Sequence, residues 1–363
     1  MRAETAEIQK AIAALPLKKS VVIMEVCGTH TMAIARNGIK SMLPEKVNLL
    51  SGPGCPVCVT PAGVIDRILE LAMRPDTVIA TYGDMVRVPG SIPGDSLARR
   101  RALGAQVEIV YSPLDAVELA ERVLNKIVVF LGAGFETSAP GTAAAVLAAE
   151  EKKLQNFCLL SMLKSVEPAL RTLIASEEFS VQGFLCPGHV ATITGEKGFF
   201  FLAEDYRMPA VISGFEPEEI LTAIYRLLKQ IAYDRPALEN AYPRAVRREG
   251  NVLAQKVMAQ CFSLRDDEWR GLGNIPKSGM KLKEQFEAFD AEKKFPEFFG
   301  NGRLDSADGE TAGCRCGDVI CGRLRSEQCP LFGRRCTPED PVGPCMVSSE
   351  GACAAAYRYG GMK

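Results

Sequence analysis

The sequence has little histidine, almost no net charge and no long apolar run. Its 363 residues include only two histidines, which excludes a histidine-rich zinc enzyme. There are 43 Lys and Arg against 44 Asp and Glu, and the net charge of −1 argues against a general nucleic-acid binder or a charged tail. The longest apolar runs, such as Ile127–Leu131, are much shorter than the roughly 18 residues that span a membrane. We therefore expect a protein that binds neither nucleic acid nor membranes.

The first fifteen residues lack the apolar core of a signal peptide. Glu4, Glu7 and Lys10 lie among the apolar positions of this stretch. The remaining composition is that of a globular protein, with 47% hydrophobic and 24% charged residues, and the length suggests two or three domains. We expect a soluble, cytoplasmic protein.

Cysteine, in contrast, is abundant, with thirteen residues. In a reducing compartment such cysteines are more often metal ligands or redox catalysts than structural disulfides. Their distribution is uneven, because seven lie between residues 314 and 353 and six occupy the preceding 313 residues. The seven are Cys314, Cys316, Cys321, Cys329, Cys336, Cys345 and Cys353.

Short apolar segments alternate with segments of helical periodicity through most of the chain. This alternation predicts an α/β fold with parallel strands and with helices covering the faces of the sheets. The expected strands are Val21–Val26, Val47–Leu50, Thr77–Ala80, Val107–Tyr111, Ile127–Leu131, Phe157–Ser161, Gly183–Cys186 and Ala210–Ser213. The expected helices are Ala62–Met73, Leu97–Leu103, Gly141–Lys153, Glu167–Ala175, Glu216–Ile231 and Val252–Cys261.

We divide the chain into three domains by the position of these elements. Residues 18–115 and 116–230 are expected to form two Rossmann-like α/β domains, although the same strands could build one large sheet. Residues 231–363, together with an N-terminal helix within 1–17, are expected to form a smaller, cysteine-rich domain. Little apolar periodicity remains from Gly300 onward, so a bound metal cluster is the natural organiser of this part.

Residues able to do chemistry follow the predicted strands, at the edge where open α/β folds place their sites. The first such motif is Cys27-Gly28-Thr29-His30. The glycine lets the backbone approach a ligand, and His30 could contact whatever the Cys27 thiolate binds. The alternative is a buried cysteine at a strand end, next to a hydrogen-bonded histidine.

The second motif is a Cys-x-x-Cys, formed by Cys55 and Cys58 in a loop rich in glycine and proline. Two thiolates at this spacing can chelate one metal or form a redox disulfide. Cys27 is the only obvious further thiol in this half of the chain. Three thiolates without a fourth protein ligand would leave room for an exogenous group, which favours a transfer site over a structural one.

Two further strand-end motifs are less specific. The turn Gly132–Pro140 has the glycines of a phosphate-binding turn but lacks the ending of a P-loop, and it presents Glu136. An ATP-using enzyme is therefore a weak third interpretation. Cys186-Pro187-Gly188-His189 places the second histidine after a strand, in a site or at a helix cap. The loops Tyr82–Pro89 and Gly214–Pro217 complete the set, and neither specifies a reaction.

Four C-terminal cysteines have the spacing Cys314-x14-Cys329-x6-Cys336-x16-Cys353. Four thiolates without histidine suit zinc or an iron–sulfur cluster. The close Cys-x-x-Cys pairs of a zinc ribbon are absent, so the wide spacing favours a [4Fe–4S] cluster. Cys316 lies two residues from a candidate ligand, where a cluster could pass electrons to a disulfide.

In their order along the chain, these motifs resemble the HypD-type [NiFe]-hydrogenase maturation proteins. The resemblance rests on Cys27–Thr31, Gly52–Cys58, Gly134–Pro140, Cys186–Gly195 and the spacing of the four C-terminal cysteines. It implies two α/β domains and a third around a [4Fe–4S] cluster. It also implies a metallochaperone-like scaffold for the Fe(CN)2CO moiety of the hydrogenase, working with a HypC-type chaperone and a HypE-type cyanide donor. Such a protein is an assembly scaffold with a redox function rather than a conventional turnover enzyme.

The resemblance also implies roles for individual residues. Cys27 would hold the iron together with a cysteine of the chaperone, and Cys55 and Cys58 would be further thiols of that iron site. Cys316 and Cys345 would be a redox pair, and Cys321 has no implied role. The cluster ligands would be Cys314, Cys329, Cys336 and Cys353. We add His30, Glu136 and His189 as candidate site residues.

One departure and one rival interpretation remain. Met32 stands where some relatives have a second histidine, so that histidine is not a general requirement. The rival is an iron–sulfur-dependent thiol–disulfide oxidoreductase, in which Cys55 and Cys58 cycle as a disulfide and the cluster supplies their electrons.

Overall fold

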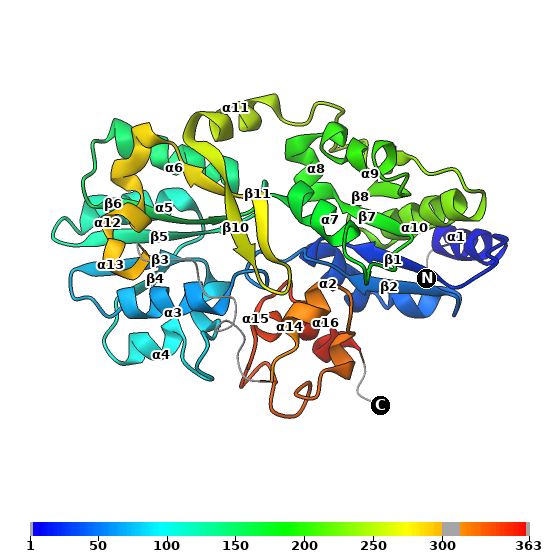
Figure 1. The fold of residues 1–363 in the computed structure, drawn as a ribbon, viewed down its shortest axis with the longest axis horizontal. Coiled ribbons are helices and arrows are strands. Elements are labelled where there is room, and N and C mark those ends of the chain that lie inside the picture. Colours follow the sequence, from blue (N-terminus) through cyan, green and yellow to red (C-terminus); the bar gives the residue numbers. More distant parts are fainter. Residues whose placement is uncertain (1–2, 300–312, 361–363) are drawn as a thin grey trace.

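The computed structural model describes residues 3–299 and 313–360. Within them two parallel sheets form two α/β lobes, and a cysteine-rich segment, residues 313–360, lies between the lobes on one side (Figure 1). The predicted fold class is confirmed. The parts of the expected third domain at 1–2, 300–312 and 361–363 lie outside the described residues.

The first lobe is built on a five-stranded parallel sheet in the order β2-β1-β7-β8-β9. Its strands are β1 (Val21–Glu25), β2 (Val47–Ser51), β7 (Gly183–Pro187), β8 (Ala210–Ser213) and β9 (Leu238–Asn240). Its helices are α1 (Ala3–Ala13), α2 (Gly28–Arg36), α8 (Gly188–Thr194), α9 (Phe200–Glu204) and α10 (Pro217–Ala232). Helix α1 packs on α10, so it belongs to this lobe rather than to the cysteine-rich segment.

The second lobe is built on a four-stranded parallel sheet in the order β4-β3-β5-β6. Its strands are β3 (Thr77–Thr81), β4 (Val107–Ile109), β5 (Ile127–Gly134) and β6 (Phe157–Leu163). Its helices are α3 (Ala62–Leu71), α4 (Leu97–Ala102), α5 (Pro113–Arg122) and α6 (Ala139–Glu151), and α7 (Val166–Ile174) leads back to the first lobe. All residues of β3 and β6 are buried, as expected for strands covered on both faces.

The sheets do not follow the expected division of the chain at residue 115. Strands β1 and β2 pair with β7, β8 and β9, while β3 and β4 pair with β5 and β6. The chain thus leaves the first lobe after β2, builds the second lobe, and returns at β7. Apolar periodicity marks the strands, but their pairing depends on contacts between distant residues.

An antiparallel hairpin, β10 (Phe262–Trp269) and β11 (Gly273–Leu282), was not expected from the sequence. Only the first and last residues of β10, Phe262 and Trp269, are buried, and most residues between them are polar or charged, so no apolar run reveals the strand. The hairpin follows the expected helix α11 (Val252–Cys261) and lies between the two lobes (Figure 1). Two short helices, α12 (Ala291–Lys294) and α13 (Pro296–Phe299), come after it.

The cysteine-rich segment contains three short helices, α14 (Cys316–Ile320), α15 (Pro344–Val347) and α16 (Ala352–Tyr359). Helix α16 packs against α2 of the first lobe. Gly271, in the turn of the β10–β11 hairpin, lies so close to Gly317 of α14 that a Cβ atom built on it would be 2.6 Å from the Gly317 Cα. The segment is therefore anchored beside the carboxyl end of β1. None of the helices in the described ranges is long and apolar enough to cross a membrane.

Candidate functional site

The loops after β1 and β2 pack directly on each other. Cys27 ends the extended chain after β1 and is the N-cap of α2. The amide of Gly28 donates a hydrogen bond to the Gly54 carbonyl, with an N···O distance of 2.9 Å. A Cβ atom on Gly54 would lie 2.3 Å from the Cys27 nitrogen, so glycine is needed there for close approach. We call Cys27, the 52–58 loop and residues 345–351 the thiol site.

The close contact between Gly54 and the backbone of Cys27 leads to a first prediction. In Gly54→Ala, the new methyl group meets backbone atoms of Cys27, which cannot turn away as a flexible side chain could. We expect a loss of about 1–3 kcal/mol in unfolding free energy, measured by urea unfolding. The control is Gly83→Ala, where the nearest atom to a new Cβ is 4.0 Å away. Equal stabilities of the two variants would contradict the packing described.

Cys27 is held by the carboxylate of Glu25. The Glu25 side chain accepts a hydrogen bond from the Cys27 amide at 3.1 Å and another from the Thr31 hydroxyl. Burial raises the pKa of Cys27 to about 12, although the backbone amides of His30 and Thr29 favour its thiolate. In the metal-free protein this group is therefore a neutral thiol, and a metal that binds it displaces a proton.

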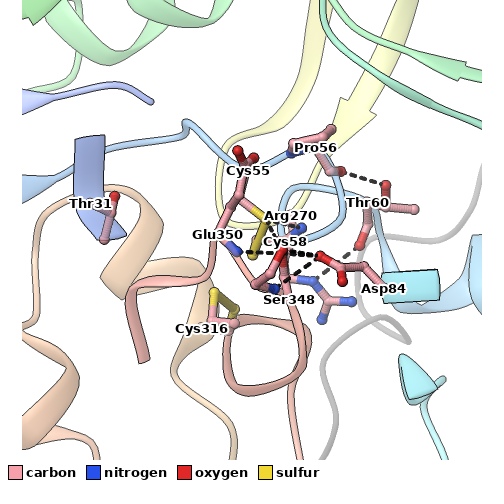
Figure 2. Close-up of a disulfide and its surroundings, with 12 residues drawn as sticks. Thr31, Cys55, Pro56, Cys58, Thr60, Asp84, Arg270, Cys316, Ser348 and Glu350 are labelled. Atoms are coloured by element: carbon pink, nitrogen blue, oxygen red, sulfur yellow. Dashed lines mark hydrogen bonds between the residues drawn. A yellow bond between two sulfur atoms is a disulfide. The ribbon is translucent and has the colours of Figure 1, made fainter. Parts of the chain in front are cut away.

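Cys55 and Cys58 are joined as a disulfide, which is one of the two states expected for this motif (Figure 2). Both residues are buried, at 5% and 2% exposure. The Cys55 sulfur lies 3.3 Å from the Ser348 hydroxyl oxygen and 3.2 Å from the Cys58 amide nitrogen. The loop is therefore in direct contact with the cysteine-rich segment.

The cysteine-rich segment contributes a second disulfide, between Cys316 and Cys345. Figure 2 draws both disulfides in one view, with Ser348 next to the Cys55 sulfur. Ser348 follows Cys345 by three residues, so a single turn of chain joins the second disulfide to the first. Cys321 is apart from this arrangement, because its thiol donates to the Gly271 carbonyl at 3.2 Å.

The four remaining cysteines of the segment line one small pocket, together with the Cys316–Cys345 disulfide, Arg315 and apolar side chains. Burial raises the pKa of Cys314 to about 11 and that of Cys353 to about 12, and the other pocket cysteines raise both further. In residues 3–299 and 313–360, no three or more His, Cys, Asp or Glu side chains are placed so that they could hold a single metal ion. The four thiols line a pocket instead. Four thiols in an apolar lining fit an iron–sulfur cluster. They are Cys314, Cys329, Cys336 and Cys353.

Arg270, at the tip of the β10–β11 hairpin, connects the pocket with the Cys-x-x-Cys loop. Its amide donates to the Val59 carbonyl at 2.8 Å, and its Nε donates to the Thr60 carbonyl at 3.1 Å. The side chain is 5% exposed, and its charge favours the thiolate of Cys314. A guanidinium keeps its charge even when buried, so a positive charge acts on Cys314 and is fixed to the chain that follows Cys58.

The two histidines meet at one phenylalanine. The rings of His30 and His189 both stack on Phe215, with centroids 4.7 and 3.9 Å away. The His30 Nε2 lies 2.9 Å from the Gly214 carbonyl oxygen, and burial lowers the pKa of His30 to about 4. His30 is therefore neutral. Its ring packs the loop after β8 against α2, and the ring of His189 packs the same loop against α8.

Glu136 is bound within the second lobe. Its Oε1 accepts hydrogen bonds from the Ser165 hydroxyl at 2.7 Å and the Val166 amide at 3.0 Å, and burial raises its pKa. These contacts fix the Gly132–Pro140 turn to the start of α7. A Cβ atom on Gly134 would lie 2.4 Å from the Ser138 Cβ, so this glycine has a packing role.

Sequence reasoning missed four residues that hold the thiol site together. Three are Ser348, Glu350 and Arg270, and the fourth, Asp84, lies in a strand-end loop to which no reaction was assigned. Asp84 accepts hydrogen bonds from Ser348 and Ser349, and Glu350 accepts one from the Thr29 hydroxyl at 2.7 Å. The position of Asp84 after a strand was the only available signal.

The fold and this site define a two-lobed α/β protein in which buried thiols and two disulfides gather where the loops after β1 and β2 meet the cysteine-rich segment. The family model HypD, described as the hydrogenase formation hypA family, matches residues 2–360. The chain therefore belongs to the HypD family of hydrogenase maturation factors.

Individual relatives agree with this family. The chain is 44% identical over 350 residues to hydrogenase maturation factor HypD2 of Bradyrhizobium diazoefficiens, across 94% of this chain and 90% of that protein. It is 42% identical over 362 residues to HypD of Rhodobacter capsulatus, across 99% and 95%. It is 43% identical over 338 residues to HypD of Escherichia coli, across 93% and 88%.

Proposed function

We propose that this protein is a scaffold on which the Fe(CN)2CO moiety of a [NiFe]-hydrogenase is assembled. In this proposal a HypC-type chaperone shares the iron with the protein, and a HypE-type protein donates cyanide. The single observation that supports it best is the contact of the Cys27 backbone with the Cys-x-x-Cys loop, which itself touches the chain after Cys345. The reaction is expected in the reducing cytoplasm, where thiols remain available as ligands.

Cys27 is the protein ligand that we assign to the iron. Low-spin iron with cyanide and carbonyl ligands is soft, and a thiolate is the suitable protein donor for it. The N-terminus of α2 favours the thiolate once the proton has left, because the amides of Thr29 and His30 face the sulfur. Glu25 holds the backbone of Cys27 and so fixes the direction of its side chain.

We assign Cys55 and Cys58 a redox role rather than direct ligation, because both sulfurs are engaged in a disulfide. Cys316 and Cys345 form the second pair, and the chain between Cys345 and Ser348 connects the two pairs. A [4Fe–4S] cluster held by Cys314, Cys329, Cys336 and Cys353 would supply single electrons beside Cys316. The buried Arg270 charge would stabilise the thiolates formed nearby on reduction.

Iron analysis of the complex with the chaperone tests this proposal. The two proteins are co-purified anaerobically, and iron and acid-labile sulfide are both measured. A scaffold is expected to hold iron in excess of sulfide, since the cargo iron brings no sulfide. Equal amounts of iron and sulfide would argue against it.

A thiol–disulfide oxidoreductase is the second candidate, and the two neighbouring disulfides favour it. In that case Cys55 and Cys58 would exchange with an external substrate and Cys27 would be dispensable. Turnover of a disulfide substrate by Cys27→Ser at the wild-type rate would support this candidate.

A further inference from the structure

Ser348 is in direct contact with one of the two sulfurs of the Cys-x-x-Cys pair. Its hydroxyl oxygen lies 3.3 Å from the Cys55 sulfur, and the residue is 1% exposed, so water does not compete for this contact. Ser348 directly follows α15, the helix that carries Cys345. The proposed function gives no role to this hydroxyl.

The hydrogen bonds of Ser348 leave one position for Cys55. A serine hydroxyl donates one hydrogen bond and accepts two. It donates to the Asp84 carboxylate at 3.3 Å, and it accepts from the Glu350 amide at 3.1 Å. The remaining acceptor position faces the Cys55 sulfur. A thiol can donate a hydrogen to this position, whereas a sulfur in a disulfide carries none.

Asp84 fixes the direction of the hydroxyl hydrogen. Its Oδ2 atom also accepts hydrogen bonds from the Ser349 amide at 2.9 Å and the Ser349 hydroxyl at 2.7 Å. A charged carboxylate is a much stronger acceptor than a disulfide sulfur. The hydroxyl hydrogen of Ser348 therefore stays directed at Asp84, and the free lone pair of the hydroxyl oxygen stays directed at Cys55.

We infer that Ser348 is a positioning residue that makes the Cys55–Cys58 disulfide easier to reduce, by accepting a hydrogen bond that only the Cys55 thiol can donate. The inference rests on the redox role proposed for this pair. The hydrogen bond from the Cys58 amide to the Cys55 sulfur does not need a sulfur-bound hydrogen, so it is available in both states. Ser348 is then the partner of Cys55 that distinguishes the reduced pair from the disulfide.

The reduction can be written with any dithiol as the electron donor. One of its thiolates bonds to the Cys58 sulfur, the Cys55–Cys58 bond breaks, and the electron pair goes to Cys55. Cys55 takes up the proton that the attacking thiol had lost and donates it in the hydrogen bond to Ser348. The second thiol then displaces Cys58 from the mixed disulfide and gives it a proton, and the dithiol becomes a disulfide.

Redox equilibration with dithiothreitol tests the inference on the full-length protein. Wild type and variants are equilibrated anaerobically in mixtures of reduced and oxidised dithiothreitol, quenched by alkylation and digested with trypsin. Residues 47–67, between Lys46 and Arg67, form a peptide whose only cysteines are Cys55 and Cys58, so mass spectrometry reads this pair alone.

In Ser348→Ala we expect the equilibrium to shift roughly three- to tenfold against reduction, as for the loss of one buried hydrogen bond. This corresponds to roughly 15–30 mV. Ser349→Ala is the matched control, because Ser349 also donates to Asp84 but has no hydrogen bond to Cys55. Ser348→Thr keeps the hydroxyl and should stay within about twofold of wild type.

An unchanged equilibrium in Ser348→Ala, or an equal shift in Ser349→Ala or Ser348→Thr, would overturn the inference. The assay needs no iron and no partner protein. If Ser348→Ala leaves the redox equilibrium unchanged while the wild-type protein retains cyanide-bearing iron, only the role of Ser348 is rejected. Failure to retain that iron, with a normal redox equilibrium, rejects the scaffold instead.

Discussion

Replacing Cys27 by serine is expected to abolish retention of the cyanide-bearing iron while leaving the fold and the cluster pocket intact. Serine is nearly isosteric with cysteine, so packing at this buried position changes little. Its hydroxyl is far less acidic than a thiol and is a poor donor for soft iron. The pocket cysteines belong to a separate segment, so the loss should be selective. Infrared absorption of the complex co-purified with the chaperone is measured beside its cluster absorbance.

Cys158→Ser is the matched control for this prediction. Cys158 is fully buried in β6, and its thiol faces the Val128 carbonyl at 3.7 Å, a contact that a hydroxyl can keep. We expect wild-type infrared bands from this variant. Full band intensity in Cys27→Ser would show that Cys27 is not the iron ligand, and Cys55 and Cys58 would become the leading candidates.

Replacing Cys353, or any other of the four pocket cysteines, by alanine is expected to remove the iron–sulfur cluster and loosen residues 313–360. This segment has only short helices, and four of its thiols line one small pocket. Ligation of the cluster is then part of its folding free energy. Iron and acid-labile sulfide after anaerobic reconstitution, together with limited proteolysis, measure both effects.

Cys321→Ala is the control for the pocket variants, because Cys321 lies in the same segment but does not line the pocket. It should reconstitute to the wild-type iron and sulfide content. Full cluster content in the alanine variant of Cys314, Cys329, Cys336 or Cys353 would remove that residue from the set of ligands.

Most strands of the two parallel sheets were predictable because they are largely buried, as in β3, where every residue is buried, whereas the partly exposed β9 and the hairpin strands β10 and β11 were missed. Helix α5 was missed although its signal was present. Ser112 and Asp115 form a capping box, and Pro113 stands at the first turn. The grouping of strands into lobes depends on pairs such as Ile23 with Gly183, which no local pattern reveals.

For the site, the thiols were predictable and their supporting residues were not. Cysteine is informative by its chemistry alone, so type and spacing singled out Cys27, Cys55 and Cys58, and their role in the site stays a prediction. Ser348 is an ordinary serine in the sequence, and its contact with Cys55 joins positions 293 residues apart. Its hydrogen bond to Asp84 spans 264 residues. Such contacts follow from the tertiary fold, so only the structure shows them.

Infrared spectroscopy of the wild-type protein, co-purified anaerobically with its HypC-type chaperone, tests the scaffold role most directly. Cyanide and carbonyl ligands on iron absorb in a region that is free of protein bands. The scaffold role predicts both kinds of band in the complex. A complex that contains its full iron–sulfur cluster but shows neither band would contradict the scaffold and favour the oxidoreductase.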